Sequence, residues 1–174
     1  MKKKDFELNE FIAVYTEADL DCFGLGYVLA VNDDYLLIQS IDPKGDLDGL
    51  TLYAINDIIL VERKTKYCDK IEKLIELKKV KLKEYNINQN DYVDWLLRKS
   101  KEEKRLINIQ LLGNPECTLF GIVEKIEKET CSLVQINQYG IKDGKCQFDI
   151  ENISSIKYDS NDDFELSLLL KNSK

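Results

Sequence analysis

The chain contains no histidine and, among its 174 residues, only two prolines and eight glycines. Without histidine the protein lacks the commonest general base and metal ligand, and with it the Ser-His and Cys-His pairs of nucleophilic catalysis. The glycines form no phosphate-binding loop, because Gly24-Leu-Gly26 lies in a predicted strand and no helix follows it. We interpret that segment as a β-bulge. These absences predict a non-enzymatic protein without a cofactor.

Cysteines are few and poorly placed for metal binding. The chain has five, none in a Cys-x-x-Cys pair, so the spacing of a structural zinc site is absent. An odd number without a repeated pairing also argues against a disulfide framework. Only Cys22 and Cys117 occupy matching positions in the internal repeat described below. We expect reduced thiols that behave as small buried hydrophobic side chains.

Long apolar runs are missing as well. No uninterrupted stretch approaches the ~20 residues of a membrane span, and the amino terminus Met-Lys-Lys-Lys-Asp-Phe-Glu lacks the apolar core of a signal peptide. The hydrophobic content of 44% with 33% charged residues is that of a globular protein. The sequence therefore predicts a soluble cytoplasmic protein that does not bind membranes.

What the chain does contain is one unit written twice. Residues 11–63 and 106–158 match without a gap at a constant offset of 95. A fixed repeat indicates one supersecondary unit per copy. The matching identities include Cys22/Cys117, Gly26/Gly121, Ile41/Ile136, Gly45/Gly140 and Asp48-Gly49/Asp143-Gly144.

Each copy predicts five short strands, because segments rich in β-branched and aromatic residues alternate with turn-forming residues. The acidic segment 17–23 is predicted to be a turn, and a glycine inside the second strand indicates a bend or bulge. The predicted strands are 11–16, 25–31, 35–41, 50–55 and 58–62 in the first copy and 106–111, 120–126, 131–136, 145–148 and 153–158 in the second.

Helices are expected between and after the copies. Tyr67, Ile71 and residues 74–75 form an apolar stripe at helical spacing. After the polar run 86–90, Asn90 or Asp91 is predicted to cap a second helix that buries Tyr92, Trp95 and Leu96. The apolar segment 164–170 lies 95 residues after 69–75, so it is a candidate for a shorter second copy of the first helix.

The predicted fold class is therefore mainly β with an α-helical connector. Five short curved strands favour closure into a small antiparallel barrel, which removes the sheet edges. We expect a first barrel over 1–66, a helical connector over 67–104 and a second barrel with a C-terminal apolar segment over 105–174.

The order of turns resembles an Sm-like or SH3-like barrel, most visibly in Ile107-Asn-Ile-Gln-Leu followed by Leu119-Phe-Gly-Ile-Val-Glu-Lys-Ile. The stretches 32–36 and 127–131, where Sm proteins carry RNA-binding residues, depart from that pattern, so no such role is carried over. Gly26-Tyr-Val-Leu-Ala-Val-Asn-Asp-Asp also resembles uncharacterised small proteins of low-GC Gram-positive bacteria, together with Gln39-Ser-Ile-Asp-Pro and Asp48-Gly49. That resemblance implies no activity.

Charge is unevenly placed within the net −7. The first copy, residues 11–63, holds 2 basic and 10 acidic residues, and the second copy, 106–158, holds 5 basic and 7 acidic residues. The connector between them, 64–105, holds 13 basic and 8 acidic residues. The basic connector therefore has two possible partners, the acidic first copy or an external anion, and we favour the first. The first copy gains acid that the second lacks, which makes these five residues candidates for binding a partner: Asp19, Asp21, Asp33, Asp34 and Asp46.

Paired carboxylates such as Asp33-Asp34 and Asp46-Leu-Asp48 could hold a divalent cation. We favour the simpler interpretation that aspartate and glycine build hairpin turns, because only Asp48-Gly49 recurs in the second copy, so no metal site is assigned.

Two functions remain. The first is a protein-interaction module whose acidic first barrel docks on a basic protein, as an inhibitor or immunity protein does. The alternative is an Sm-like RNA-binding adaptor that uses the basic connector and the second barrel. RNA is the less favoured ligand, because the acidic first copy repels phosphate.

Overall fold

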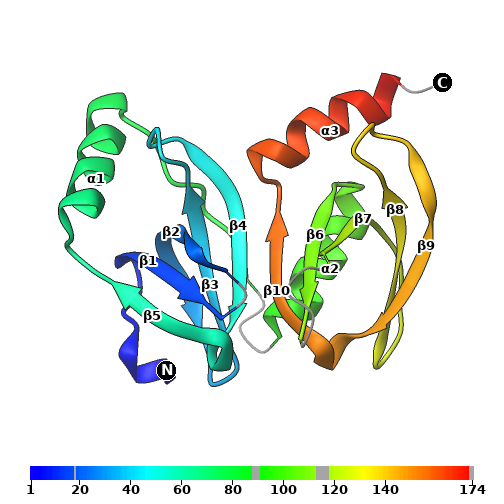
Figure 1. Cartoon of the computed structure of the whole chain (residues 1–174), viewed down its shortest axis with the longest axis horizontal. Coiled ribbons are helices and arrows are strands. Elements are labelled where there is room, and N and C mark those ends of the chain that lie inside the picture. Colours follow the sequence, from blue (N-terminus) through cyan, green and yellow to red (C-terminus); the bar gives the residue numbers. More distant parts are fainter. Residues whose placement is uncertain (18, 88–90, 113–117, 173–174) are drawn as a thin grey trace. The chain divides into compact units, whose positions relative to one another are not determined.

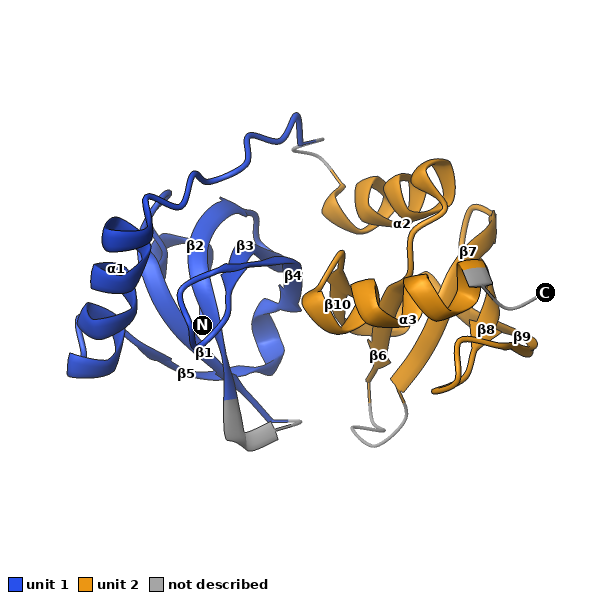
Figure 2. Ribbon diagram, turned by 90° about the horizontal axis from the view of Figure 1, so that it is seen from above, with its two compact units in different colours: residues 1–89 blue, residues 90–174 orange. Residues whose placement is uncertain are grey.

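The computed structural model describes residues 1–17, 19–87, 91–112 and 118–172, with only the backbone described for residues 19–22 and for residue 172. The chain divides into two compact units, Met1–Gln89 and Asn90–Lys174, which Figure 2 colours separately. We call them unit 1 and unit 2. Within the described part of the chain, the protein is mainly β, with five antiparallel strands in each unit and three α-helices in all.

Unit 1 contains five strands followed by a helix (Figure 1). Its elements are η1 (Lys3–Asp5), β1 (Phe11–Thr16), β2 (Asp19–Val31), β3 (Tyr35–Ile41), β4 (Leu47–Ala54), η2 (Ile55–Asp57), β5 (Ile58–Glu62) and α1 (Lys66–Lys78). The strands are ordered β5-β1-β2-β3-β4, with antiparallel pairing throughout.

Unit 2 repeats this plan after a helix of its own. Its elements are α2 (Tyr92–Glu103), β6 (Ile107–Leu111), β7 (Thr118–Ile126), β8 (Thr130–Ile136), β9 (Lys142–Asp149), η3 (Ile150–Asn152), β10 (Ile153–Tyr158) and α3 (Asn161–Asn172). The strand order β10-β6-β7-β8-β9 is that of unit 1 with the corresponding strands.

The predicted offset of 95 is confirmed in the backbone. β4 and β9, η2 and η3, and the first residues of α1 and α3 are each displaced by 95. The register agrees as well, since Gly26 pairs with Ser40 and Gly121 with Gln135. The apolar C-terminal segment is therefore the second copy of the helix that follows the sheet, as its position in the sequence suggested.

The prediction of two closed five-stranded barrels joined by a helical segment is wrong. In the described pairings of unit 1, β5 pairs with β1, and no bond joins β5 to β4. The one-turn helix η2 connects the end of β4 to β5, which pairs with the edge of β1 opposite to β2. Bulges in the strand pairs curve the sheet but do not close it. The helical segment is not a separate connector either, because α1 belongs to unit 1 and α2 to unit 2.

The sheet of unit 1 is buried on both faces. Ile12 and Val14 of β1 join one apolar cluster with Phe6, Val28 and Ile38. Phe11 and Ala13, which point the other way, join a second cluster with Cys68, Ile71 and Ile75 of α1. A strand buried on both faces accounts for the uninterrupted apolar run at the start of β1.

Both helices that were predicted to pack do so. In α1, Ile71 is fully buried and Leu74 is half-buried. In α2, Tyr92 and Leu96 are buried, Trp95 is half-buried, and the helix packs on β7. Each helix begins where a side chain caps it: Thr65 Oγ1 accepts the Cys68 N–H, and Asp91 Oδ1 accepts the Asp94 N–H.

The predicted acidic turn over 17–23 is corrected by the structure, because β2 begins at Asp19 and runs for 13 residues. Its first part pairs with the end of β1, with Asp19 opposite Thr16 and Gly24 opposite Val14. Cross-strand hydrogen bonds outweigh the low strand preference of aspartate here.

Candidate functional site

Of the five acidic residues predicted to bind a partner, the structure describes the side chains of Asp33, Asp34 and Asp46. Asp19 pairs with Thr16 at the start of β2, whereas Asp33 and Asp34 follow Val31 at its other end. The side chains of Asp19 and Asp21 lie outside the described residues, as do Cys117 and the side chain of Cys22.

Asp33 and Asp34 lie in the turn between β2 and β3, with exposed side chains. Asn32 organises this turn, because its Oδ1 accepts hydrogen bonds from the N–H groups of Asp34 and Tyr35 at 3.0 and 2.7 Å. No ion pair within the described part of the chain involves Asp33 or Asp34. Their negative charges are therefore open to solvent.

Asp46 is neutralised inside unit 1. Its Oδ2 lies 2.6 Å from Lys78 Nζ at the end of α1. Gln39 of β3 also holds the chain beyond α1, because its Oε1 accepts the Lys83 N–H at 3.1 Å. Lys78 and Lys83, in the first half of the basic connector, thus contact the acidic first copy, which was the favoured alternative.

This arrangement changes the charge balance. With α1 and the segment after it included, residues 1–89 hold 13 basic and 17 acidic residues, a net of −4. Residues 90–174 hold 12 and 15, a net of −3. The excess acid of the first copy is therefore largely balanced within unit 1, and what remains is local to its turns.

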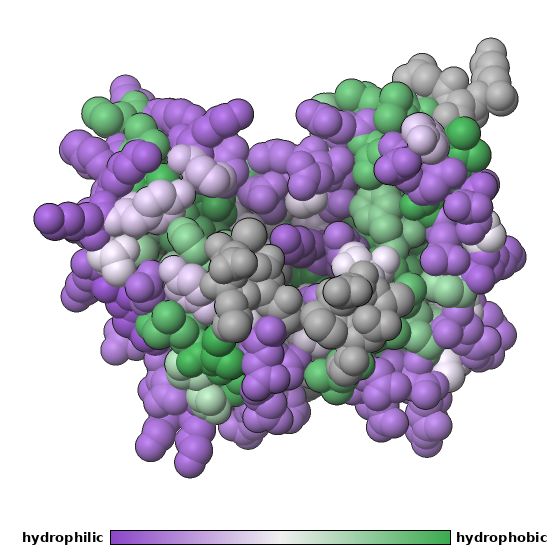
Figure 3. Space-filling view, viewed as in Figure 1, coloured by the Kyte–Doolittle hydropathy of each residue, from purple (hydrophilic) through white to green (hydrophobic). Residues whose placement is uncertain are grey.

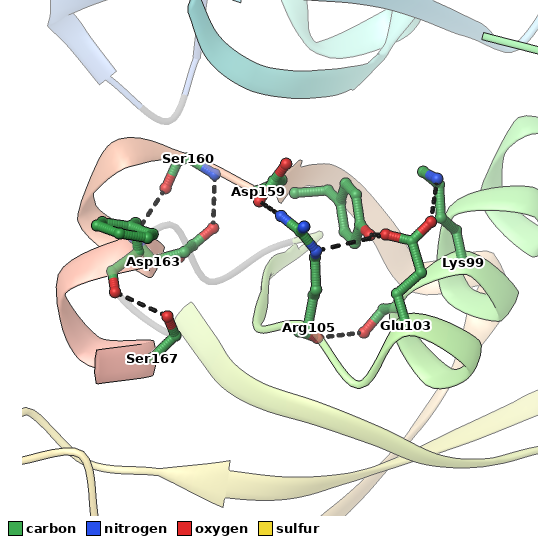
Figure 4. A network of polar contacts seen from close by, with 10 residues as sticks. Lys99, Glu103, Arg105, Asp159, Ser160, Asp163 and Ser167 are labelled. Atoms are coloured by element: carbon green, nitrogen blue, oxygen red, sulfur yellow. Dashed lines mark hydrogen bonds and ion pairs between the residues drawn. The ribbon is translucent and has the colours of Figure 1, made fainter. Parts of the chain in front are cut away.

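Unit 2 contains a cavity of about 350 Å³ beside a polar network (Figure 4). One group of contacts joins α2 to β10 and the turn after it, and a second group lies at the start of α3. The cavity is lined by charged side chains on both sides and by Leu106, Phe164 and Ser167, the charged residues being Glu103, Lys104, Arg105, Asp159, Asp163 and Lys171.

Glu103 is the centre of the network. Its Oε2 accepts a hydrogen bond of 2.5 Å from the buried Tyr158 hydroxyl, and its Oε1 accepts one from Lys99 Nζ. Burial opposes ionisation of Glu103, but the hydrogen bonds from Lys99 and Tyr158 and the charges of Lys99 and Arg105 lower its pKa below the ordinary value. Burial, followed by the hydrogen bond with Glu103, raises the pKa of Tyr158.

The rest of the network is also internally paired. Arg105 contacts Asp159 through Nη1 and Glu103 through Nε, the latter at 3.4 Å. Asp163 is 5% exposed and forms a capping box with Ser160: its Oδ2 accepts the Ser160 N–H, and its own N–H donates to Ser160 Oγ. Glu103, Arg105 and Asp159 are thus paired with one another.

Unit 1 has an ion pair at the place that corresponds to this network. Glu10 and Arg63, the counterparts of Arg105 and Tyr158, form an ion pair of 2.9 Å at the same place. Lys64 and Asp159, which also correspond, share the left-handed backbone, with φ of 51° and 58°. Both units therefore tie the start of the first strand to the turn before the helix, with opposite charge order.

Metal binding has no support in the described residues, where no group of three or more cysteine, aspartate and glutamate side chains could hold an ion. Burial raises the pKa of the Cys131 thiol to about 12, so it stays protonated at neutral pH.

A group of aromatic and apolar side chains lies on unit 1, where β1, β2, β5 and α1 meet; Phe23 and Leu60 are exposed, whereas Tyr15 and Tyr67 are half-buried against the core. The Tyr15 and Phe23 rings are 5.1 Å apart, and Phe23 meets Tyr67 edge-on at 5.5 Å. Leu60 of β5 pairs directly with Tyr15. Phe23 is 37% exposed and Leu60 46%. We call these four residues the aromatic surface: Tyr15, Phe23, Leu60 and Tyr67.

Unit 2 lacks this surface although its backbone is the same. The corresponding residues are Gln110, Thr118, Ser155 and Asp162. In place of the Tyr15–Leu60 pair, Ser155 Oγ donates to Gln110 Oε1 at 3.3 Å. The fold does not require aromatic side chains here, so they are a specific property of unit 1. Comparing the two copies at strand positions as well as at acidic turns would have found them in the sequence.

Comparison of the chain with known protein families, curated proteins and solved structures gives no match. In the part of the chain that the structure describes, the helices are too short or too polar to cross a lipid bilayer.

Proposed function

We propose that the protein is a non-enzymatic interaction module whose unit 1 binds a basic protein through the aromatic surface. The observation that carries this proposal is the substitution of Tyr15, Phe23 and Tyr67 for polar residues at matching positions of unit 2. Aromatic side chains are enriched among the residues that anchor protein interfaces, and here the exposed Phe23 is held in place by the half-buried Tyr15 and Tyr67. Inhibition of a basic toxin, as by an immunity protein, is one role that such a module could fill.

The surroundings of the aromatic surface favour a partner rich in arginine or lysine. Glu17 is exposed at the end of β1, and Glu62 accepts a hydrogen bond of 3.0 Å from the Tyr15 hydroxyl. Tyr67 already has an ammonium group above its ring, since Lys70 Nζ lies 5.7 Å from the ring centre. Cations of a partner can stack on the neighbouring rings and meet these carboxylates.

The alternative, an adaptor that binds RNA through the basic connector and unit 2, has less support. On α1, Lys73 is paired with Glu76 and Lys78 with Asp46. In unit 2, Lys125 is paired with Glu127 and Lys145 with Glu124. Each such carboxylate reduces the positive field that phosphate binding needs.

The test replaces Phe23 and Leu60 by the residues that unit 2 has at the same positions, giving Phe23→Thr/Leu60→Ser. The matched control is Leu77→Asn. It removes a leucine of α1 that is 67% exposed and is not part of the aromatic surface, and it introduces asparagine, the residue of unit 2 at the corresponding position 172. Tagged wild-type protein and both variants are used to capture partners, and the affinity of the purified partner is then measured.

We expect wild type and Leu77→Asn to bind the same basic protein, and the double variant to bind it at least tenfold more weakly, because the anchoring side chains are gone. Equal affinity of all three proteins would refute the proposal. Captured material that disappears on ribonuclease treatment, with affinity falling steeply as salt rises, would establish the RNA alternative instead.

A further inference from the structure

A second exposed apolar region lies on unit 2, on α3 and the loop between β8 and β9. Phe164, Leu168 and Leu169 of α3 are 62%, 44% and 49% exposed, and Tyr139 and Ile141 of the loop are 65% and 51% exposed. In Figure 3, hydrophobic residues gather in the region that α3 occupies in Figure 1. We call these five residues the α3 surface.

The loop contacts the helix at Leu169, and Phe164 and Lys171 of the helix also line the cavity of unit 2. A Cβ atom built on Gly140 would lie 2.6 Å from Leu169 Cβ, so the backbone between Tyr139 and Ile141 touches α3 directly. Gly45 approaches Leu74 of α1 in the same way. The packing of helix on loop is thus common to both units, with a leucine at the contact in each, and the other four side chains of the α3 surface differ.

Unit 1 shows that the apolar character is not required by the fold. The counterparts of Phe164 and Leu168 in α1 are Asp69 and Lys73, and both are exposed. The counterpart of Ile141 is Asp46, which is paired with Lys78. An exposed apolar face of this kind on one of two equivalent helices indicates that something covers it.

The charges on α3 indicate what covers it. Glu165 lies in the first half of the helix and Lys171 in its last turn, and no ion pair within the described residues involves either. Six residues apart on one helix, they cannot reach each other. If two α3 helices pack antiparallel and cross at Leu168, each Glu165 lies beside the Lys171 of the other copy, because 168 is midway between them.

We propose that the α3 surface binds the α3 surface of a second copy of this chain, forming a two-fold symmetric dimer. A two-fold interface uses the same patch on both partners, and a patch with an apolar centre and opposite charges at its two ends is complementary to itself. Five side chains make a smaller patch than the ~800 Å² per partner of a standard interface, so the dimer dissociates on dilution. This inference uses unit 2 and stands independently of the partner proposed for unit 1.

The test measures mass by sedimentation as a function of protein concentration. We expect the wild type to pass from monomer to dimer between about 1 µM and 1 mM, the range of a small interface. Phe164→Asp/Leu168→Lys introduces the residues of α1 and should remain monomeric, with a circular dichroism spectrum and melting temperature that show an intact fold. Phe23→Thr/Leu60→Ser, which leaves α3 unchanged, should dimerise as the wild type does.

Charge reversal tests the antiparallel arrangement. Glu165→Lys and Lys171→Glu should each weaken the dimer several-fold by placing like charges together, and the double variant should restore it by exchanging the two members of each pair. A wild type that stays monomeric over the whole range, a dimer that survives Phe164→Asp/Leu168→Lys, assembly beyond a dimer, or failure of the double reversal to restore association would each overturn the proposal.

Discussion

At the scale of single residues, Tyr158 and Glu103 show how unit 2 holds a charge near its core. Tyr158 is 2% exposed, and its hydroxyl donates to a carboxylate that also binds Lys99. The equivalent place in unit 1 is occupied by Arg63 and Glu10. A tyrosine can replace the arginine because Arg105, at the Glu10 position, supplies the positive charge from the neighbouring strand.

The lowered pKa of Glu103 makes the contribution of its carboxylate to folding stability dependent on pH. A carboxylate whose pKa is lower in the folded than in the unfolded state stabilises the fold above its unfolded pKa, and that stabilisation is lost as the pH falls through the folded pKa. Glu103→Gln should therefore lower the free energy of unfolding by about 1 kcal/mol at pH 7, a modest value because the side chain is partly exposed. The difference from wild type should shrink on acidification, as measured by urea unfolding across pH.

The control for this prediction is Glu102→Gln, which removes an exposed carboxylate next to Glu103 in the sequence without breaking the hydrogen bond from Tyr158. It should change stability little at any pH. If Glu102→Gln and Glu103→Gln have the same effect at pH 7, the network contributes nothing beyond general charge.

At the scale of elements, two glycines set the close approach of neighbouring strands. A Cβ on Gly26 or Gly121 would lie 2.2 Å from the carbonyl oxygen of Gln39 or Val134 on the next strand. These positions precede the bulges that curve β2 and β7. The sequence predicted a bulge at Gly24-Leu-Gly26, but the pairing is regular there and the bulge lies between Val28 and Ala30. The close backbone contact is the reason for the glycine at position 26.

Gly121→Ala should be strongly destabilising, by about 3 kcal/mol, because backbone must move to admit the methyl group. Gly144→Ala is the matched comparison: its φ of 88° is unfavourable for alanine, but nothing lies within 4 Å of the added Cβ. It should cost only the ~1–2 kcal/mol of a left-handed alanine. Thermal or urea unfolding measures both. A smaller loss for Gly121→Ala than for Gly144→Ala would contradict the close-contact explanation.

The accuracy of the sequence predictions also varies by element. β1, β3, β5 and β10 have the predicted bounds, because apolar alternation and flanking turn residues coincide there. β9 is twice the predicted length, and β2 extends through an acidic segment. In both cases polar residues take strand conformation because a neighbouring strand offers hydrogen bonds, and a local pattern does not contain that information.

At the scale of the whole molecule, the net charge of −7 creates a field that attracts basic proteins at a distance. The exposed carboxylates of Asp33 and Asp34 contribute to this field, whereas Asp46 is screened by Lys78. An acidic docking surface on the first copy stays a prediction.

Asp33→Asn/Asp34→Asn should leave stability unchanged and slow association with the basic partner severalfold at low salt, since electrostatic steering acts on the association rate. The dissociation rate should stay the same, and the difference should vanish above about 0.5 M salt as screening grows. Stopped-flow kinetics against salt measures this, with Asp46→Asn as a comparison of smaller effect. An unchanged association rate at low salt would show that the turn acids serve solubility alone.

The sequence by itself determined the duplication, the position of most strands, the helices and the turn glycines, because each is written in local spacing and in the match between copies. Tertiary structure decided what no local pattern contains. In unit 1, η2 leads to β5, which pairs with the free edge of β1 and not with β4, so the sheet stays open. Asp46 forms an ion pair with Lys78, 32 residues later. The aromatic surface exists because Tyr15, Phe23, Leu60 and Tyr67, distant in the chain, meet where two strand pairs and a helix come together.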